Sequence, residues 1–142
     1  MSKRQPGEPL ARNFKTIVAE ADAKVETLSV AEAAERREDP NVQFVDIRDV
    51  RELDREGTIP GAIHAPRGML EFWVDPESPY YRSELDNGKK LVLFCGGGWR
   101  SALSAASLTD MGVEDVAHMD GGFGAWKEAG QPTEPRQRRS KD

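Results

Sequence analysis

The sequence KLVLFCGGGWR, residues 90–100, is the part of the chain that decides the fold class. Its first half, residues 90–94, is a short apolar run, which is typical of a strand buried on both faces of a parallel sheet. Three glycines follow Cys95, and a helix rich in Ala, Leu and Ser is predicted over Arg100–Met111, with Gly112 ending it. A buried strand, a glycine turn and a helix in this order favour an α/β fold.

The same alternation of short strands and helices continues along the rest of the chain. Strands are expected at residues 25–28, at 42–47, after the turn at 59–63, and at 115–119; helices are expected at 29–37, 49–56, 68–74 and 123–129. Ser29 and Glu32 have the spacing of a capping box, which marks the start of a helix. This order predicts a mainly parallel sheet with helices on both faces.

The chain is expected to hold one folded domain with an extension at each end. Residues 1–24 form the N-terminal extension, where apolar side chains at helical spacing over Leu10–Lys24 predict an amphipathic helix lying on the domain. Residues 25–132 form the domain. Residues 133–142 are expected to form a flexible basic tail, since residues 135–142 carry four basic side chains and one Asp. A chain of 142 residues leaves no room for two full domains.

The composition excludes several classes of partner and site. The net charge is −5, whereas nucleic-acid binding needs clustered positive charge, so no nucleic acid is expected. No apolar run approaches the roughly 20 residues of a membrane helix, and the start lacks the apolar core of a secretory signal. The one Cys excludes an internal disulfide and a cysteine-rich zinc site. We therefore expect a cytoplasmic protein that binds no membrane, no metal and no cofactor.

Cys95 combines four features that favour a reactive thiolate. It follows the most apolar strand at its carboxyl end, where ligands bind in open α/β sheets. The three glycines after it let several backbone N–H groups point at one spot. The helix that begins near Arg100 adds the positive charge of its N-terminus, and the Arg100 guanidinium adds a fixed charge. These features stabilise a thiolate, and the same cradle would hold an anion such as a thiosulfonate or a persulfide.

The residues alone leave other interpretations open. A lone Cys can be a small buried apolar side chain, and glycines after a strand can serve only to turn the chain. A Cys-His protease could use His64 or His118, although a hydrogen-bonded structural role is the simpler interpretation of both histidines. A Ser-His-Asp hydrolase has no support, because Ser101 and Ser104 lack the G-x-S-x-G turn.

Three segments together resemble the rhodanese family. They are VDIR at residues 45–48 with Glu52, GTIPGAIHAP at residues 57–66, and CGGGWRS at residues 95–101 with its helix, followed by GGF at residues 121–123 and Trp126. The likeness covers roughly residues 25–132. It implies a rhodanese-like three-layer α/β/α fold around a mainly parallel sheet of about five strands. It also implies a sulfurtransferase, which moves a sulfane sulfur from thiosulfate or a persulfide to a thiol or cyanide through a Cys persulfide.

The resemblance assigns roles to residues of this chain. Cys95 matches the persulfide-forming Cys, and Arg100 is expected to be the second catalytic residue. Backbone N–H groups of the cradle are expected to bind the substrate, and they belong to Gly96, Gly97, Gly98 and Trp99. Apart from the resemblance, Asp46 and Ser101 are expected to give structural support: Asp46 ends a predicted strand, where it either holds neighbouring loops through hydrogen bonds, the simpler interpretation, or acts directly in catalysis.

Four further side chains have open assignments. Arg67 follows a predicted strand end, where it either faces the cradle and binds an anionic donor or is solvated. Trp99 either walls the pocket or packs on the next helix. Arg48 and Glu52 are expected to form a local ion pair or to brace the loop. With Arg100 as the only side-chain cation in the loop, a persulfide is a better candidate than thiosulfate for the natural donor.

Two alternatives to a sulfurtransferase remain, and the length and composition of the Cys95 loop argue against both. A phosphatase or arsenate reductase would follow the related branch of the superfamily, whose loop is one residue longer than the six residues from Cys95 to Arg100. A non-catalytic rhodanese-like regulatory or sulfur-carrier module would dock a partner on the terminal segments, but the intact Cys95, glycines and Arg100 argue against a degenerate copy. The expected partners are a small-molecule sulfur donor, a thiol or cyanide acceptor, and a protein that accepts sulfur.

Overall fold

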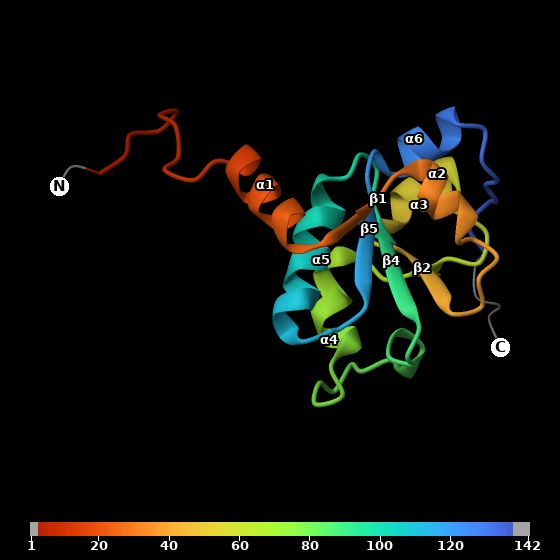
Figure 1. Ribbon diagram of the computed structural model, residues 1–142. Coiled ribbons are helices and arrows are strands. Elements are labelled where there is room, and N and C mark those ends of the chain that lie inside the picture. Colours follow the sequence, from red (N-terminus) through yellow and green to blue (C-terminus); the bar gives the residue numbers. More distant parts are fainter. Residues whose placement is uncertain (1–2, 138–142) are drawn as a thin grey trace.

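Five parallel strands form the central sheet of the computed structural model, which describes residues 3–137 (Figure 1). They are β1 (Glu26–Leu28), β2 (Val42–Asp46), β3 (Ile63–His64), β4 (Lys90–Phe94) and β5 (Val116–Met119). Their order across the sheet is β1-β5-β4-β2-β3, and each neighbouring pair is parallel. The predicted α/β fold with a parallel sheet is confirmed. Since β4 is the middle strand, the loop after it lies at the centre of the carboxyl edge of the sheet.

Helices cover both faces of the sheet. They are α1 (Phe14–Lys24), α2 (Val30–Glu35), α3 (Val50–Glu56), α4 (Leu70–Val74), α5 (Trp99–Met111) and α6 (Gly122–Glu128). Figure 1 shows α1, α4 and α5 on one side of the sheet and α2, α3 and α6 on the other. The chain also has two short 3-10 turns, η1 (Arg67–Met69) and η2 (Ser83–Leu85). The segment predicted as one helix, residues 68–74, is divided between η1 and α4, and no element was predicted at η2.

The side chains of β4 alternate between two apolar layers, because successive residues of a strand point to opposite faces. Leu91 and Leu93 belong to the layer beneath α4 and α5, together with Leu70, Ala105 and Leu108. Val92 and Phe94 belong to the layer on the other face, together with Phe44, Phe123 and Trp126. Burial on both faces is the reason that this strand is apolar throughout.

Local signals fix the ends of several helices as the sequence predicted. The Ser29 side chain accepts a hydrogen bond from Glu32 N, and the Glu32 side chain accepts one from Ser29 N, which completes the capping box of α2. Asp49 and Glu52 form a second capping box at the start of α3. Helix α5 ends at Gly112, whose φ of 100° lies in the left-handed region that glycine adopts without strain.

The N-terminal helix packs on α5 through small side chains. It begins at Phe14 rather than at Leu10, because the Asn13 side chain accepts a hydrogen bond from Thr16 N at 3.0 Å and caps the helix there. The buried Ala21 of α1 lies in one apolar cluster with Ala102 and Ala106 of α5. These small residues let the two helix backbones approach closely.

The segment after α6 returns to the domain. Thr58 and Glu134 pair their backbones in an antiparallel bridge, with distances from nitrogen to oxygen of 2.8 and 2.9 Å. The Arg136 guanidinium lies 2.9 Å from an Asp54 carboxylate oxygen. The first part of the expected flexible tail therefore contacts the domain, while residues 138–142 lie outside the described residues.

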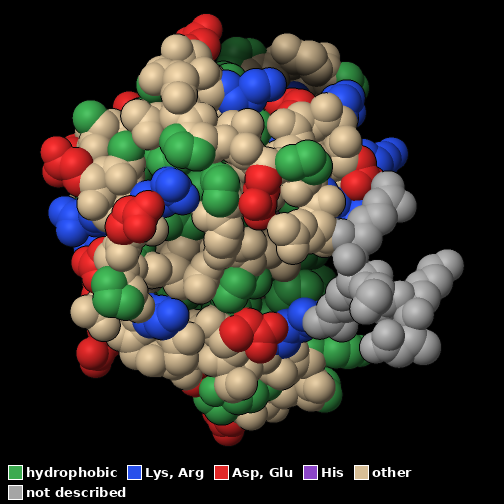
Figure 2. All heavy atoms as spheres, turned by 90° about the vertical axis from the view of Figure 1, so that its right-hand side faces the viewer, with side chains coloured by type: hydrophobic (Ala, Val, Ile, Leu, Met, Phe, Trp, Pro, Cys, Tyr) green, Lys and Arg blue, Asp and Glu red, His purple; other side chains and the backbone are tan. Residues whose placement is uncertain are grey.

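The surface carries charges of both signs. Figure 2 shows Lys and Arg side chains lying among Asp and Glu side chains on the face at the right of Figure 1, without a continuous basic area among the described residues of that face. Within residues 3–137, the longest helix is α5 with 13 residues, and none combines the length and apolar character needed to span a membrane.

Candidate active site

Cys95 lies directly after β4, with 1% of its surface exposed. Its Sγ accepts a hydrogen bond from the backbone N–H of Gly98 at 3.1 Å. This contact requires the loop to curl back on itself, and Gly98 has a φ of 113°, which side-chain-bearing residues rarely adopt. The sulfur atom therefore faces the inside of the loop, next to the N-terminus of α5, where a negative charge on sulfur is stabilised.

The start of α6 holds the other side of the loop. Phe123 N donates to Cys95 O at 2.7 Å, and Gly124 N donates to Gly96 O at 3.1 Å. Gly122 makes this approach possible, because a Cβ atom on it would lie 2.5 Å from Cys95 O. Its φ of 60° also lies in the left-handed region. The two glycines that precede Phe123 therefore let α6 reach the loop and fix the backbone of Cys95.

Trp99 is the first residue of α5, and 62% of its surface is exposed. Its ring packs against Phe14 of α1, with 4.7 Å between the ring centroids. The sequence predicted that Trp99 either walls the pocket or packs on the next helix, and neither prediction included Phe14 as its partner. The aromatic pair instead joins the beginning of α1 to the beginning of α5, beside the Cys95 loop.

Arg100 is neutralised by a carboxylate from α3. Its two terminal nitrogens lie 2.7 and 3.1 Å from the two oxygens of Glu52. These hydrogen bonds are the main reason that the pKa of Arg100 is raised and the pKa of Glu52 is lowered; interaction with Cys95 also raises the pKa of Arg100. The guanidinium borders the loop, because a Cβ atom on Gly96 would lie 3.1 Å from it. Glu52 therefore pairs with Arg100, and not with Arg48 as one sequence interpretation had it.

Ser101 joins the thiol to a buried histidine. The Cys95 thiol lies in hydrogen-bond contact with Ser101 Oγ at 3.6 Å, and Ser101 Oγ lies 2.9 Å from His118 Nδ1. The other ring nitrogen of His118, Nε2, lies 2.9 Å from a carboxylate oxygen of Asp22 in α1. The structure thus places four polar side chains in one continuous row that starts at the sulfur.

Asp46 forms a buried ion pair at the end of β2. Its two carboxylate oxygens accept hydrogen bonds from Arg48 Nε at 3.0 Å and Nη2 at 2.9 Å, and both side chains are fully buried. Asp46 also accepts from Thr58 Oγ1 at 2.7 Å, and Arg48 donates to Gly57 O at 2.6 Å. These contacts tie the end of β2 to the segment after α3, next to the strand that ends in Cys95.

His64 lies on the edge strand β3, and Arg67 begins the turn η1 just after that strand. Arg67 is exposed, and its side chain makes no hydrogen bond or ion pair with another residue in the range 3–137. His64 Nε2 lies 2.7 Å from Arg48 O and so contacts the backbone rather than the thiol. Donor binding by Arg67 stays a prediction.

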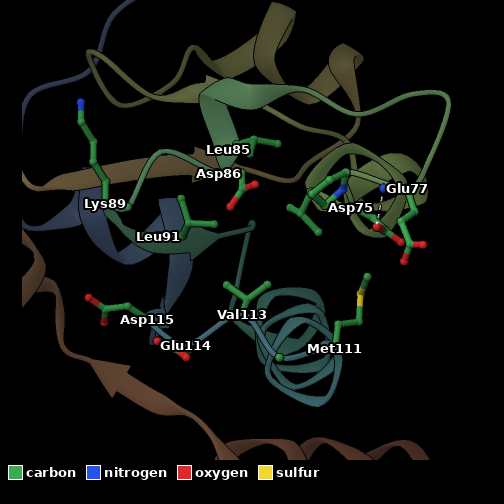
Figure 3. Close-up of a pocket in the computed structure, with 14 residues that line it drawn as sticks. Asp75, Glu77, Leu85, Asp86, Lys89, Leu91, Met111, Val113, Glu114 and Asp115 are labelled. Carbon is green, nitrogen blue, oxygen red and sulfur yellow. Dashed lines mark hydrogen bonds between the residues drawn. The ribbon is translucent and has the colours of Figure 1, made fainter.

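A cavity of about 560 Å³ lies at the other end of the sheet (Figure 3). Its walls come from the beginning of β4, the end of α5 and the segment after α4, so it is separated from Cys95 by the length of the strand. Figure 3 shows the apolar side chains of Leu91 and Val113 together with the carboxylates of Asp86 and Asp115. Within residues 3–137, no group of three or more His, Cys, Asp or Glu side chains is arranged so that it could hold a metal ion.

Sequence reasoning missed four residues of this site as functional candidates. Gly122 is part of a motif in the sequence analysis, Glu52 is expected there to pair with Arg48 or to brace the loop, and the simpler interpretation of His118 is a structural one. Asp22 was not singled out at all. The signal for Gly122 was the pair of glycines after β5, whereas the other three depend on contacts between distant segments.

Comparisons with known proteins identify the family of the chain. Residues 29–129 match the family model of the rhodanese-like domain. The thiosulfate sulfurtransferase GlpE of Shewanella oneidensis is 34% identical over 102 residues, which cover 72% of this chain and 92% of that protein. This chain is therefore similar, over most of its length, to a rhodanese-like protein that is named as a sulfurtransferase.

Two solved structures are similar over most of their length. A protein of unknown function from Rhodopseudomonas palustris, described as a possible tyrosine phosphatase, is 46% identical with a TM-score of 0.87, covering 92% of this chain and all of that one. The polysulfide-sulfur transferase homodimer of Wolinella succinogenes is 30% identical with a TM-score of 0.66, covering 87% of this chain and 88% of that one. By its family match, its sheet and its cysteine loop, the chain belongs to the rhodanese-like family.

Proposed function

We propose that this protein is a sulfurtransferase in which Cys95 carries a sulfane sulfur as a persulfide. The observation that supports the proposal most directly is the hydrogen bond from Gly98 N–H to Cys95 Sγ at the N-terminus of α5. A backbone donor and a helix N-terminus both stabilise an anionic sulfur. Membership of the rhodanese-like family and the likeness to GlpE support the same chemistry.

The reaction takes two displacement steps at sulfur. In the first, the Cys95 thiolate attacks the outer sulfur of the donor; with thiosulfate, the S–S bond of the donor breaks and sulfite leaves with the electron pair. The new S–S bond makes Cys95 a persulfide. In the second, an acceptor thiolate or cyanide attacks the terminal sulfur, and Cys95 leaves again as a thiolate. Charge is conserved in each step, and the Gly98 N–H stabilises the anionic sulfur in both.

Arg100 shapes the choice of donor. Because the Glu52 carboxylate neutralises the guanidinium through one hydrogen bond to each terminal nitrogen, the loop offers an anion backbone N–H groups and little net side-chain charge. A singly charged persulfide or polysulfide suits such a cradle better than the doubly charged thiosulfate. We therefore propose a persulfide or polysulfide as the natural donor and thiosulfate as a slower one.

Phosphatase chemistry is the competing function, since a 46% identical structure is described as a possible tyrosine phosphatase. Phosphate binding needs a loop wide enough for the ester and an Arg free to form two hydrogen bonds with it. The loop from Cys95 to Arg100 has only six residues, and the guanidinium is held by Glu52. Both observations favour sulfur over phosphate as the transferred group.

The experiment compares sulfur transfer and phosphate release with the same preparation. The protein is given thiosulfate, polysulfide or glutathione persulfide as donor, cyanide or a thiol as acceptor, and separately an aryl phosphate. We expect transferred sulfur from wild type and from the control Glu77→Gln, an exposed residue at the opposite end of the sheet, none from Cys95→Ser, and no phosphate release from any of them. Phosphate release that depends on Cys95 would overturn the proposal. Absence of transfer from every donor would instead favour a non-catalytic module.

A further inference from the structure

His118 is a buried histidine whose two ring nitrogens both have a polar partner. Its side chain is 2% exposed, and it lies on β5 between the neighbouring strands. Ser101 Oγ lies on one side at 2.9 Å from Nδ1, and Asp22 Oδ1 lies on the other side at 2.9 Å from Nε2. Since Ser101 also contacts the Cys95 thiol, the histidine is one residue removed from the reacting atom.

The donors and acceptors along this row fix the direction of its hydrogen bonds. An ionised carboxylate only accepts, so His118 Nε2 carries the proton that faces Asp22, and Nδ1 of the neutral ring accepts. Ser101 has a single hydroxyl proton, and its shortest acceptor is His118 Nδ1 at 2.9 Å, compared with Gly98 O at 3.3 Å. Ser101 Oγ is then the acceptor for the Cys95 S–H.

The geometry points to a proton relay from Cys95 through Ser101 to His118, with Asp22 of α1 as a positioning residue. The S–H bond of Cys95 breaks and its proton bonds to Ser101 Oγ, while the proton of Ser101 passes to His118 Nδ1. The products are a Cys95 thiolate and an imidazolium whose Nε2–H faces the Asp22 carboxylate, so charge is conserved. After the transfer, the Ser101 O–H points at the thiolate.

This relay deepens the proposed function, on which its role in sulfur transfer rests, and it makes α1 part of the site. Asp22 lies outside residues 29–129, which match the family model. Helix α1 is held against α5 by the Ala21 packing and by an ion pair between Lys24 and Asp110 at 3.1 Å. The carboxylate of Asp22 is 47% exposed, so the buried end of the relay connects to solvent through it.

Among the described residues in contact with His118, Asp22 is the one with an ionisable side chain. On the adjacent strands, Thr27 of β1 and Leu93 of β4 are in register with His118, and neither side chain titrates. Helix α5 contributes the Ser101 hydroxyl, and α1 contributes the Asp22 carboxylate. At the other end of the relay, the Cys95 loop carries Arg100 paired with Glu52 of α3, together with the Gly98 N–H.

The test measures the rate at which iodoacetamide alkylates Cys95, because this rate reports the thiolate without requiring sulfur transfer. The variants are Asp22→Asn, His118→Asn and the double variant, with Glu20→Gln as the control. Glu20 is an acidic residue of the same helix whose partner is Arg12 rather than His118. Asp22→Asn changes an exposed side chain and keeps its size, so it carries the test even where His118→Asn lowers stability.

At pH 7, we expect alkylation to slow about tenfold in Asp22→Asn and about a hundredfold in His118→Asn, because a smaller fraction of Cys95 is thiolate when the proton has a poorer acceptor or none. The double variant should be no slower than His118→Asn, because both residues act on one proton. At a pH of about 10 the differences should vanish, because hydroxide removes the thiol proton without the relay. Glu20→Gln should match wild type throughout.

Two outcomes would overturn the relay. Wild-type rates in Asp22→Asn and His118→Asn at pH 7 would show that the thiol is deprotonated without them. Deficits that persist at high pH would assign the residues a structural role only. Neither outcome changes the result of the sulfur-transfer assay, which tests the proposed function separately. If the variants alkylate slowly but the wild type transfers no sulfur, the relay is supported and the proposed function is not.

Discussion

At the scale of single residues, Asp46 and Arg48 show how much the loops beside the site depend on one buried charge pair. Both side chains are withdrawn from water, and each has hydrogen bonds to a second segment of the chain. A buried charge that loses its partner is costly, because nothing replaces the water it gave up. The pair therefore holds the end of β2 in place rather than acting on substrate.

We predict that Asp46→Asn lowers the free energy of unfolding by about 3 kcal/mol, because the buried Arg48 guanidinium keeps only the longer ion pair with the partly exposed Glu56 at 3.8 Å. Urea unfolding measured at pH 7 checks the value. Asp110→Asn is the matched control, since the same substitution there breaks an exposed pair with Lys24. Equal stability of the two variants would contradict a structural role for Asp46.

Gly122 is the residue that lets α6 contact the Cys95 backbone. We predict that Gly122→Ala destabilises the protein by about 2 kcal/mol, through both its left-handed φ and the collision of the new Cβ with Cys95 O. The control is Gly68→Ala, where the φ is not positive and a Cβ would meet nothing within 4 Å. Thermal unfolding of both variants gives the comparison, and a Gly122→Ala protein as stable as Gly68→Ala would refute the close approach.

At the scale of elements, the Glu52–Arg100 pair joins α3 to α5 across the edge of the sheet. The pKa of Glu52 is lowered in the fold, first by the hydrogen bonds from Arg100. A lowered carboxyl pKa means that the pair stabilises the fold fully above the ordinary value of 4.5 and loses this effect as the pH falls through the lowered pKa.

We therefore predict that Glu52→Gln is less stable than wild type by about 1 kcal/mol at pH 7, and that the difference is smaller at a pH of about 3. Gln keeps the side-chain oxygen that caps α3, so the difference isolates the charge. Urea unfolding at the two pH values measures it. A difference that stays the same at both pH values would exclude the ion pair as its source.

Elements with a local signal were predictable, and contacts between distant segments were not. The apolar β4, the capping box of α2 and Gly112 at the end of α5 each carry their cause within a few residues. Glu52 and Arg100 are 48 residues apart, and Asp22 and His118 are 96 apart. Pairings of this kind depend on how helices pack, which residue spacing does not encode. The Cys95 loop lies between these cases, since its glycines signal the turn but not the partner at Gly122.

At the scale of the whole molecule, the parallel sheet separates two ends with different character. Strand β4 delivers Cys95 to the carboxyl edge, where the beginnings of α5 and α6 meet the loop. The cavity of Figure 3 lies at the amino edge and shares no residue with the loop. The carboxyl edge therefore brings backbone groups of several elements to the one residue that carries the thiol.

The central claim is that Cys95 takes up a sulfur atom, and intact-mass spectrometry of the full chain tests it most directly. The protein is incubated with polysulfide, glutathione persulfide or thiosulfate, freed of excess donor, and weighed before and after treatment with cyanide. We predict a mass increase of one sulfur atom in the wild type that cyanide removes, and no increase in Cys95→Ser. A wild-type mass unchanged by all three donors, or an equal increase in Cys95→Ser, would contradict the account.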